Sequence, residues 1–127
     1  YLPASGTPAS LTSSYTDPPT TTSGQFGGEV VALKLNIDFD DAGITSGSSP
    51  IALGDVYLCG LTSPAVVNGS TVRGFLSTAS SVLGGDTVAG LSANDATLLA
   101  AELSVAFLGG LPSQFADDHL SPTPCAP

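Results

Sequence analysis

The sequence is short of positive charge. Lys34 and Arg73 are its only basic side chains, against eleven acidic ones, and the net charge at pH 7 is −9. A chain with this balance repels nucleic acid and anionic lipid, so neither is expected as a partner. The longest apolar stretch, 96–108, is too short to cross a bilayer and is interrupted by Glu102, so no membrane insertion is expected.

Methionine and tryptophan are absent, and only 10 % of the residues are charged, against about 25 % in an average soluble domain. Apolar residues nevertheless make up 42 % of the 127 positions, and the mean hydropathy is +0.33. This apolar content is enough to build a core, which argues against a disordered chain. The length suits one domain.

Cysteine occurs only twice, at positions 59 and 125, and no CxxC motif or Cys/His cluster is present. Zinc, haem and thioredoxin-type chemistry are therefore not expected. An even pair fits one disulfide, Cys59–Cys125, in an oxidising and hence extracellular compartment. This bond would close a loop of about 67 residues and stabilise the fold by about 4 kcal/mol. Two buried thiols, or a bridge between chains through Cys125, are the alternatives.

Composition divides the chain into three parts. Residues 1–28 are rich in Thr, Ser, Pro and Gly, and are predicted to form an extended arm with a short strand at 11–15. Residues 29–120 carry the periodic apolar patterns and are predicted to form a single domain. Residues 121–127 form a Pro-rich tail that is expected to be extended.

The periodic patterns predict strands first and helices afterwards. Apolar residues alternate with mostly polar ones over 29–40, which predicts a long strand, and 53–61 is predicted to be a second strand. From residue 72 the apolar spacing changes to that of an amphipathic helix, which is predicted over 72–83 and capped by Ser70 or Thr71. The expected fold class is α+β, with a small antiparallel sheet and two helices packed on one face.

A second helix is predicted to begin at Ser92, in a capping-box pattern, and to run to Gly109-Gly110. Asp95 and Glu102 are its only charges, so it is apolar on nearly every side. Such a helix has to be covered all round, either by its own chain or by another copy. We therefore expect self-association, to which the 1–28 arm could contribute by adding to a neighbour's sheet edge.

Asp38, Asp40 and Asp41 form the strongest site candidate. On a strand, Asp38 and Asp40 would project from one face about 7 Å apart, with Asp41 at the following turn. Three hard oxygen donors beside a flexible loop suit Ca²⁺, with Asn36 or Asp55 as further ligands. The alternative is a solvated strand end with no bound ion.

Two other positions are candidates for chemistry. Asn68 begins an Asn-Gly-Ser sequon on a predicted loop, which makes it a candidate for N-glycosylation, although Asn-Gly is also a favoured turn dipeptide. His119 follows Asp117 and Asp118, but no nucleophile elbow accompanies it. No catalytic residues are therefore predicted.

Five segments, 1–8, 11–15, 29–36, 53–55 and 71–85, resemble an uncharacterised domain found near the C-terminus of large secreted bacterial proteins. The similarity covers residues 1 to 108 and implies an extracellular, non-enzymatic accessory or surface module. It carries over no site residues. The chain departs from that domain in its 117–127 tail and in its cysteine pair.

The sequence therefore predicts a secreted, non-enzymatic structural module, or a self-assembling subunit of an extracellular filament, sheath or surface layer. Copies of the chain itself are the expected partners. The alternative function is a monomeric ligand-binding, carbohydrate-binding or adhesion module of a larger exoprotein, for which a glycan would be the partner.

Overall fold

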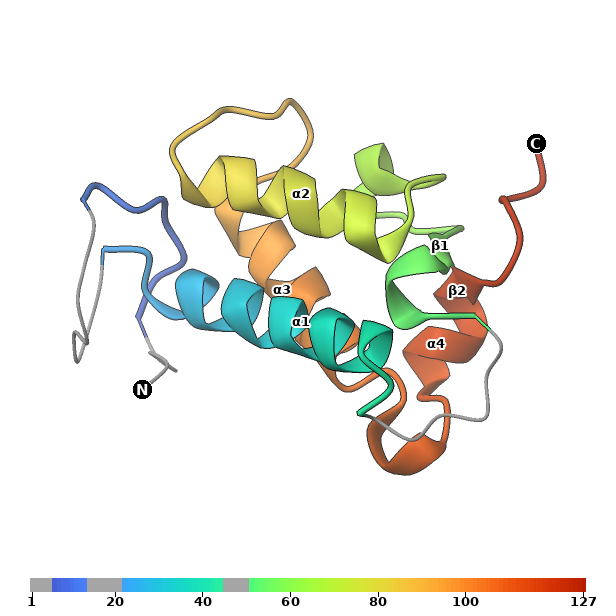
Figure 1. The fold of residues 1–127 in the computed structure, drawn as a ribbon. Helices are drawn as coiled ribbons and strands as arrows, with labels where there is room; N and C mark the ends of the chain where they lie inside the picture. The colour runs from blue at the N-terminus through green and yellow to red at the C-terminus, as the bar shows by residue number, and fades with distance from the viewer. Residues whose placement is uncertain (1–5, 14–21, 45–50) are drawn as a thin grey trace.

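The computed structural model describes residues 6–13, 22–44 and 51–127 (Figure 1). Within these ranges the chain forms four α-helices and one two-stranded antiparallel sheet, which confirms the predicted α+β class. In chain order the elements are α1 (Gln25–Asp41), β1 (Tyr57–Leu58), α2 (Val72–Leu83), α3 (Ala93–Ser104), α4 (Gln114–His119) and β2 (Leu120–Ser121). Short 3₁₀ turns lie at Leu53–Asp55, Ala65–Val67 and Leu108–Gly110.

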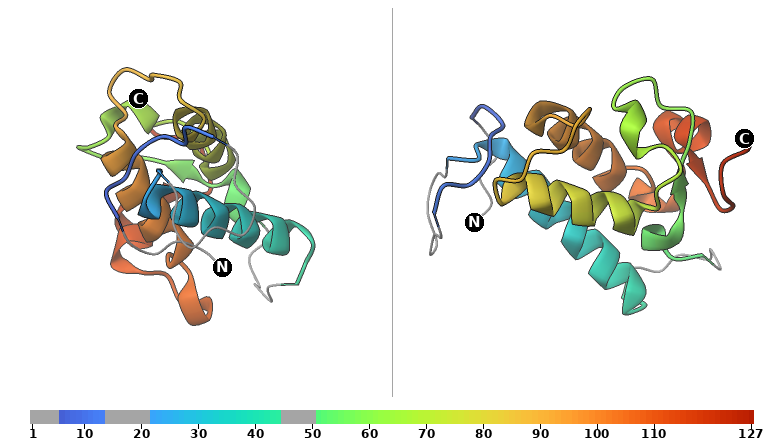
Figure 2. Two further views of the ribbon diagram at one scale, coloured as in Figure 1. Left: turned by 90° about the vertical axis from the view of Figure 1, so that its left-hand side faces the viewer. Right: turned by 90° about the horizontal axis from the view of Figure 1, so that it is seen from above.

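The core lies between α1, α2 and α3. The three helices pack side by side, while α4 and the sheet stand at one end of the molecule (Figures 1 and 2). The largest core side chains that are fully or almost fully buried are Phe26, Leu33, Ile37, Leu58, Val72, Phe75 and Leu103. No helix in the described ranges combines the length and the apolar content needed to cross a membrane.

The prediction of a strand over 29–40 is wrong, because these residues lie in α1. Its buried residues, Phe26, Val30, Leu33 and Ile37, recur at four- and three-residue intervals, so they form one helical face. The period-two alternation arises because a second set of apolar residues occupies the opposite side of the same helix. The helix also begins four residues before the predicted domain boundary at residue 29.

Both later helices are confirmed. Thr71 Oγ1 caps α2 by accepting a hydrogen bond from Gly74 N (3.1 Å), and Ser92 Oγ caps α3 by accepting one from Asp95 N (3.0 Å). The end predicted for the second helix is wrong: α3 stops at Ser104, and a 3₁₀ turn follows in place of further α-helix. Residues 105–111 therefore form a separate turn.

The predicted strand over 53–61 is reduced to two residues. β1 pairs with β2, with Tyr57 opposite Ser121 and Leu58 opposite Leu120. The other edge of β1 bonds to the segment that leads into α2, where Leu58 N donates to Ser70 O (2.8 Å). Residues Leu53–Asp55 form a 3₁₀ turn instead of strand, which brings this segment against the end of α1.

The disulfide Cys59–Cys125 is confirmed, and it lies within one chain. It joins the residue after β1 to the tail that follows β2, across a sequence separation of 66 residues. The short helix α4, which the sequence did not predict, turns the chain so that β2 can pair with β1. Together the disulfide and the β1–β2 pair hold the C-terminal segment on the domain.

The described part of the predicted arm packs on the domain. Leu11 N donates to Leu83 O (2.7 Å), and Ser10 Oγ donates to Val82 O (2.7 Å), so residues 6–13 close the C-terminal end of α2. Gly24 precedes α1 with φ +58°, and a side chain there would collide with the backbone of Gly6. Of the strand predicted at 11–15, residues 11–13 show no regular structure, and the others lie outside the described residues.

Replacing both cysteines, by Cys59→Ser with Cys125→Ser, should lower the free energy of unfolding by about 4 kcal/mol, because the unfolded chain regains the freedom that the closed loop removes. Urea unfolding followed by circular dichroism measures this change. The reduced wild-type protein is the control and should unfold at the same urea concentration as the variant. An unchanged midpoint in both would show that the disulfide does not stabilise the domain.

Candidate functional site

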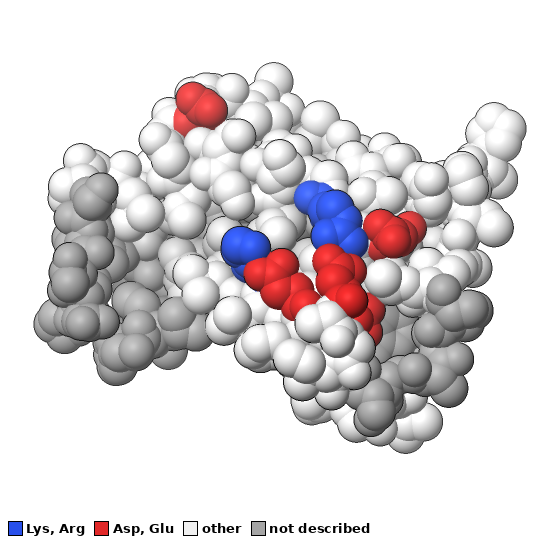
Figure 3. Space-filling model, viewed as in Figure 1, with Lys and Arg blue, Asp and Glu red and all other residues white. Residues whose placement is uncertain are grey.

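Charged side chains gather where the end of α1 meets the start of α2. This ion cluster consists of Lys34, Asp38, Asp40, Asp41, Asp55 and Arg73. It contains both basic residues of the sequence. In Figure 3 the two blue side chains lie near the centre of the visible face, each beside red carboxylates, and most of the remaining described surface is uncharged.

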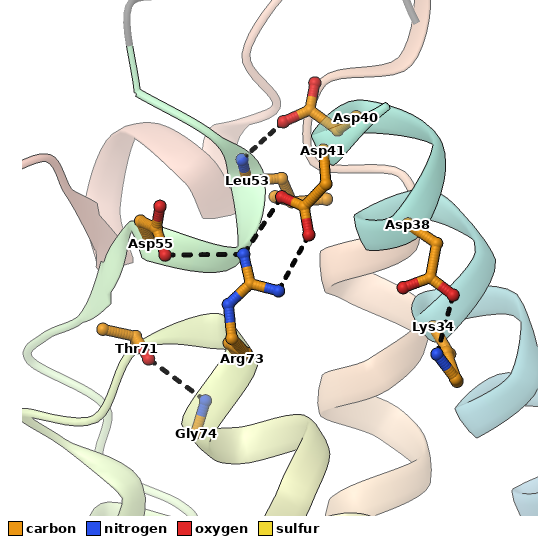
Figure 4. A network of polar contacts seen from close by, with 9 residues as sticks. All are labelled: Lys34, Asp38, Asp40, Asp41, Leu53, Asp55, Thr71, Arg73 and Gly74. Carbon is orange, nitrogen blue, oxygen red and sulfur yellow. Dashed lines mark hydrogen bonds and ion pairs between the residues drawn. The ribbon is translucent and has the colours of Figure 1, made fainter. Parts of the chain in front are cut away.

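Arg73 is the centre of the cluster. It stands in the first turn of α2, and its guanidinium donates to both carboxylate oxygens of Asp41 at 2.9 and 3.0 Å (Figure 4). A third contact joins it to Asp55 at 3.5 Å. The hydrogen bonds from Arg73 lower the pKa of Asp41, and the same bonds raise the pKa of Arg73. Gly54 leaves room for the guanidinium, since a Cβ there would lie 2.7 Å from Arg73 Cζ.

The other two aspartates of α1 also have protein partners. Lys34 Nζ donates to Asp38 Oδ2 at 2.7 Å, one helical turn apart, and both side chains are about half exposed. Leu53 N donates to Asp40 Oδ2 at 2.7 Å, which fixes the 3₁₀ turn against the end of α1 (Figure 4). The cluster therefore links three segments: α1, the turn at Leu53–Asp55 and α2.

The calcium site was predicted at the end of a strand, but the structure places its three aspartates on a helix. Asp38, Asp40 and Asp41 each contact a different protein partner. Of the suggested further ligands, Asp55 contacts Arg73, and Asn36 Nδ2 donates to Ser104 O at 3.4 Å. Across residues 6–13, 22–44 and 51–127, no three acidic, His or Cys side chains are grouped so that they could hold a metal ion. Calcium binding stays a prediction that titration can test.

An open groove of about 570 Å³ runs beside the cluster, between α1 and α2. It is lined by the apolar residues Ile37 and Leu76, by three serines, and by the charged residues Lys34, Asp38 and Arg73. Among the described residues, no aromatic ring lines this groove. The groove can offer hydrogen bonds and a small apolar surface to a ligand.

Three large apolar side chains are exposed along the outer side of α1. Val31, Leu35 and Phe39 follow one another at four-residue spacing, and their exposed fractions are 41 %, 41 % and 43 %. Helical geometry places this outer stripe opposite the buried face of the same helix. The period-two pattern did not predict this stripe, because it placed these residues on the buried face of a strand.

The second exposed apolar surface is the turn that follows α3, which we call the apolar turn. Its four exposed apolar side chains are Val105, Phe107, Leu108 and Leu111. α3 does not expose apolar side chains on every side. Leu99 and Leu103 are buried against the other helices, and Leu98 is the only one of its leucines that is exposed. The apolar surface that the sequence placed around this helix is therefore displaced to the turn beyond its end.

The two remaining candidates hold local structure. Both polar atoms of the Asn68 side chain bond to the backbone of Leu61, at 2.9 and 2.8 Å, on an exposed turn. His119 Nδ1 lies 3.1 Å from Cys59 O, and its ring packs on Phe115. Asp118 accepts hydrogen bonds from Gln114 rather than from His119. Glycosylation of Asn68 stays a prediction.

Asp41→Asn should destabilise the protein at neutral pH, because it removes the bidentate pair with Arg73. The folded-state pKa of Asp41 lies below its usual 3.8, so the stabilisation is present above that pH and is lost as the pH falls through the lower value. Urea unfolding at neutral and at strongly acidic pH should show a small difference from wild type that disappears in acid.

Asp86→Asn is the matched control, because Asp86 forms no ion pair with any described residue. It should leave the stability at neutral pH nearly unchanged. An equal loss in both variants would show that net charge, and not the Arg73 contact, sets the effect.

In a comparison with known proteins, no family model, curated protein or solved structure matches this chain. Three surface features remain from which function can be inferred: the ion cluster with its groove, the outer stripe of α1 and the apolar turn.

Proposed function

We propose that this chain is a non-enzymatic structural module that associates with copies of itself in an extracellular assembly. The outer stripe of α1 carries this proposal. Single exposed apolar residues are common on protein surfaces, but an aligned row over two helical turns offers a continuous surface for contact. A helix with apolar residues on two opposite sides needs a second packing partner.

The size of the stripe limits what it can do alone. Full burial of a Val, Leu or Phe side chain contributes about 1.5–3 kcal/mol, so covering the exposed two-fifths of three such residues contributes about 2–4 kcal/mol. Loss of free translation and rotation on association costs at least about 4 kcal/mol. The stripe therefore needs further contacts, and the apolar turn supplies a second apolar surface.

The disulfide supports the extracellular part of the proposal, because such bonds persist in oxidising compartments. The sparse surface charge supports the structural part, since few charged side chains need to lose water when copies pack together.

The groove between α1 and α2 favours a second candidate, a monomeric binding module for a small polar ligand such as a glycan. Its serine hydroxyls and ion pairs can form hydrogen bonds with sugar hydroxyls. A glycan array on the monomeric protein tests this candidate directly.

Leu35→Glu should weaken self-association about tenfold or more, because it places a charge in the centre of the contact. Leu98→Glu is the matched control, since Leu98 is exposed on a different helix. Sedimentation velocity over a concentration series measures both. A single 12.5 kDa species for the wild type at every concentration would contradict the proposed function.

Added salt should strengthen the association. Each copy carries a net charge of −9, so copies repel one another over distances that shrink to about 10 Å in 0.1 M salt. The same concentration series at low and at moderate ionic strength measures this effect. Weaker association in salt would show that ion pairs, and not apolar contacts, hold the copies together.

A further inference from the structure

We propose that the partner of the outer stripe is the same stripe of a second copy, with the two α1 helices antiparallel about a two-fold axis near Leu35. This inference rests on the proposed self-association and names the surface that carries it. In the view from above in Figure 2, α1 is the outermost helix on its side of the molecule, so a second copy can approach it there.

The order of side chains along the stripe favours the antiparallel direction. Leu35 is its centre, with a small residue, Val31, one turn before it and a large one, Phe39, one turn after it. An antiparallel pair places Val31 opposite Phe39 of the second copy at both ends. A parallel pair would place the two Phe39 rings together at one end and leave a gap between the two Val31 side chains at the other.

Charge on the two flanks of the stripe favours the same direction. Lys34 and Asp38 lie on one flank, about half exposed, whereas Ala32 and Asn36 on the other flank are uncharged. A two-fold axis that makes the helices antiparallel brings each flank against its own counterpart. Lys34 of each copy then lies beside Asp38 of the other copy. A parallel pair would set the charged flank against the uncharged one.

These exposed charge pairs determine the direction of pairing more than its strength, because each contributes little in water. The apolar contacts along the stripe supply part of the attraction, and further contacts between the two copies have to supply the rest. The two flanks and the Val31–Phe39 match then select one arrangement among those that would cover the stripe.

Introduced cysteines test the arrangement, because both natural cysteines are held in the disulfide and a new one is the only free thiol. Leu35→Cys should form a covalent dimer under mild oxidation, since residue 35 lies near the axis. Leu98→Cys, which is at least as accessible on α3, should stay monomeric. Non-reducing gel electrophoresis and intact mass spectrometry measure the dimer.

Direction is tested with two further variants. A mixture of Val31→Cys and Phe39→Cys should give mainly the mixed dimer, whereas each alone should crosslink poorly. Preferential crosslinking of Val31→Cys with itself would overturn the antiparallel arrangement.

The outcomes separate this inference from the proposed function. If the wild type associates in sedimentation but Leu35→Cys does not crosslink, α1–α1 pairing is wrong and another surface, such as the apolar turn, holds the copies together. If the wild type is monomeric at every concentration, the proposed function fails as well. Circular dichroism of each variant confirms that it is folded before crosslinking.

Discussion

The whole fold depends on the contact that the inner face of α1 makes with α2 and α3. Phe26 and Leu33 are completely buried in that contact, and Ile37 almost so. Because α1 is the longest helix, its position also decides where the other features lie. Its last turn carries Asp40 and Asp41 to the 3₁₀ turn and to α2, and its outer side presents the stripe to solvent. One helix therefore serves the core, the ion cluster and the exposed surface.

The scarcity of positive charge explains the character of the ion cluster. The chain has two basic side chains, and both lie next to carboxylates. Arg73 contacts two carboxylates, those of Asp41 and Asp55. Such a cluster is suited to holding segments together, since its charges already have partners within the protein. It still contains more acids than bases, so its surroundings favour cations over anions. The binding capacity of the molecule therefore lies more in its apolar surfaces than in its charges.

The sequence predicted those parts of the fold whose signals are local. α2 has a clear cap and one apolar face, α3 has a clear cap, and the two cysteines allowed only one internal pairing. It failed for α1, because apolar residues on two opposite sides of a helix produce the same alternation as a strand with one buried face. The apolar residues on the two sides of α1 nearly balance each other, so the sequence pattern does not indicate which side is buried. Tertiary packing decides it. The aspartates were found as a group, but their partners come from distant segments, which spacing along the chain does not reveal.

The closure of α2 by residues 6–13 has a consequence for the order of folding. Ser10 bonds to Val82 across 72 positions, so this contact has to wait until the segment that contains Val82 has been synthesised. Contacts between distant segments form slowly, because a long loop must close before they contribute. Residues 6–13 are thus made before the helix end on which they dock and are positioned only after it. Until it docks, the last turn of α2 stays open to water at the carbonyls of Val82 and Leu83.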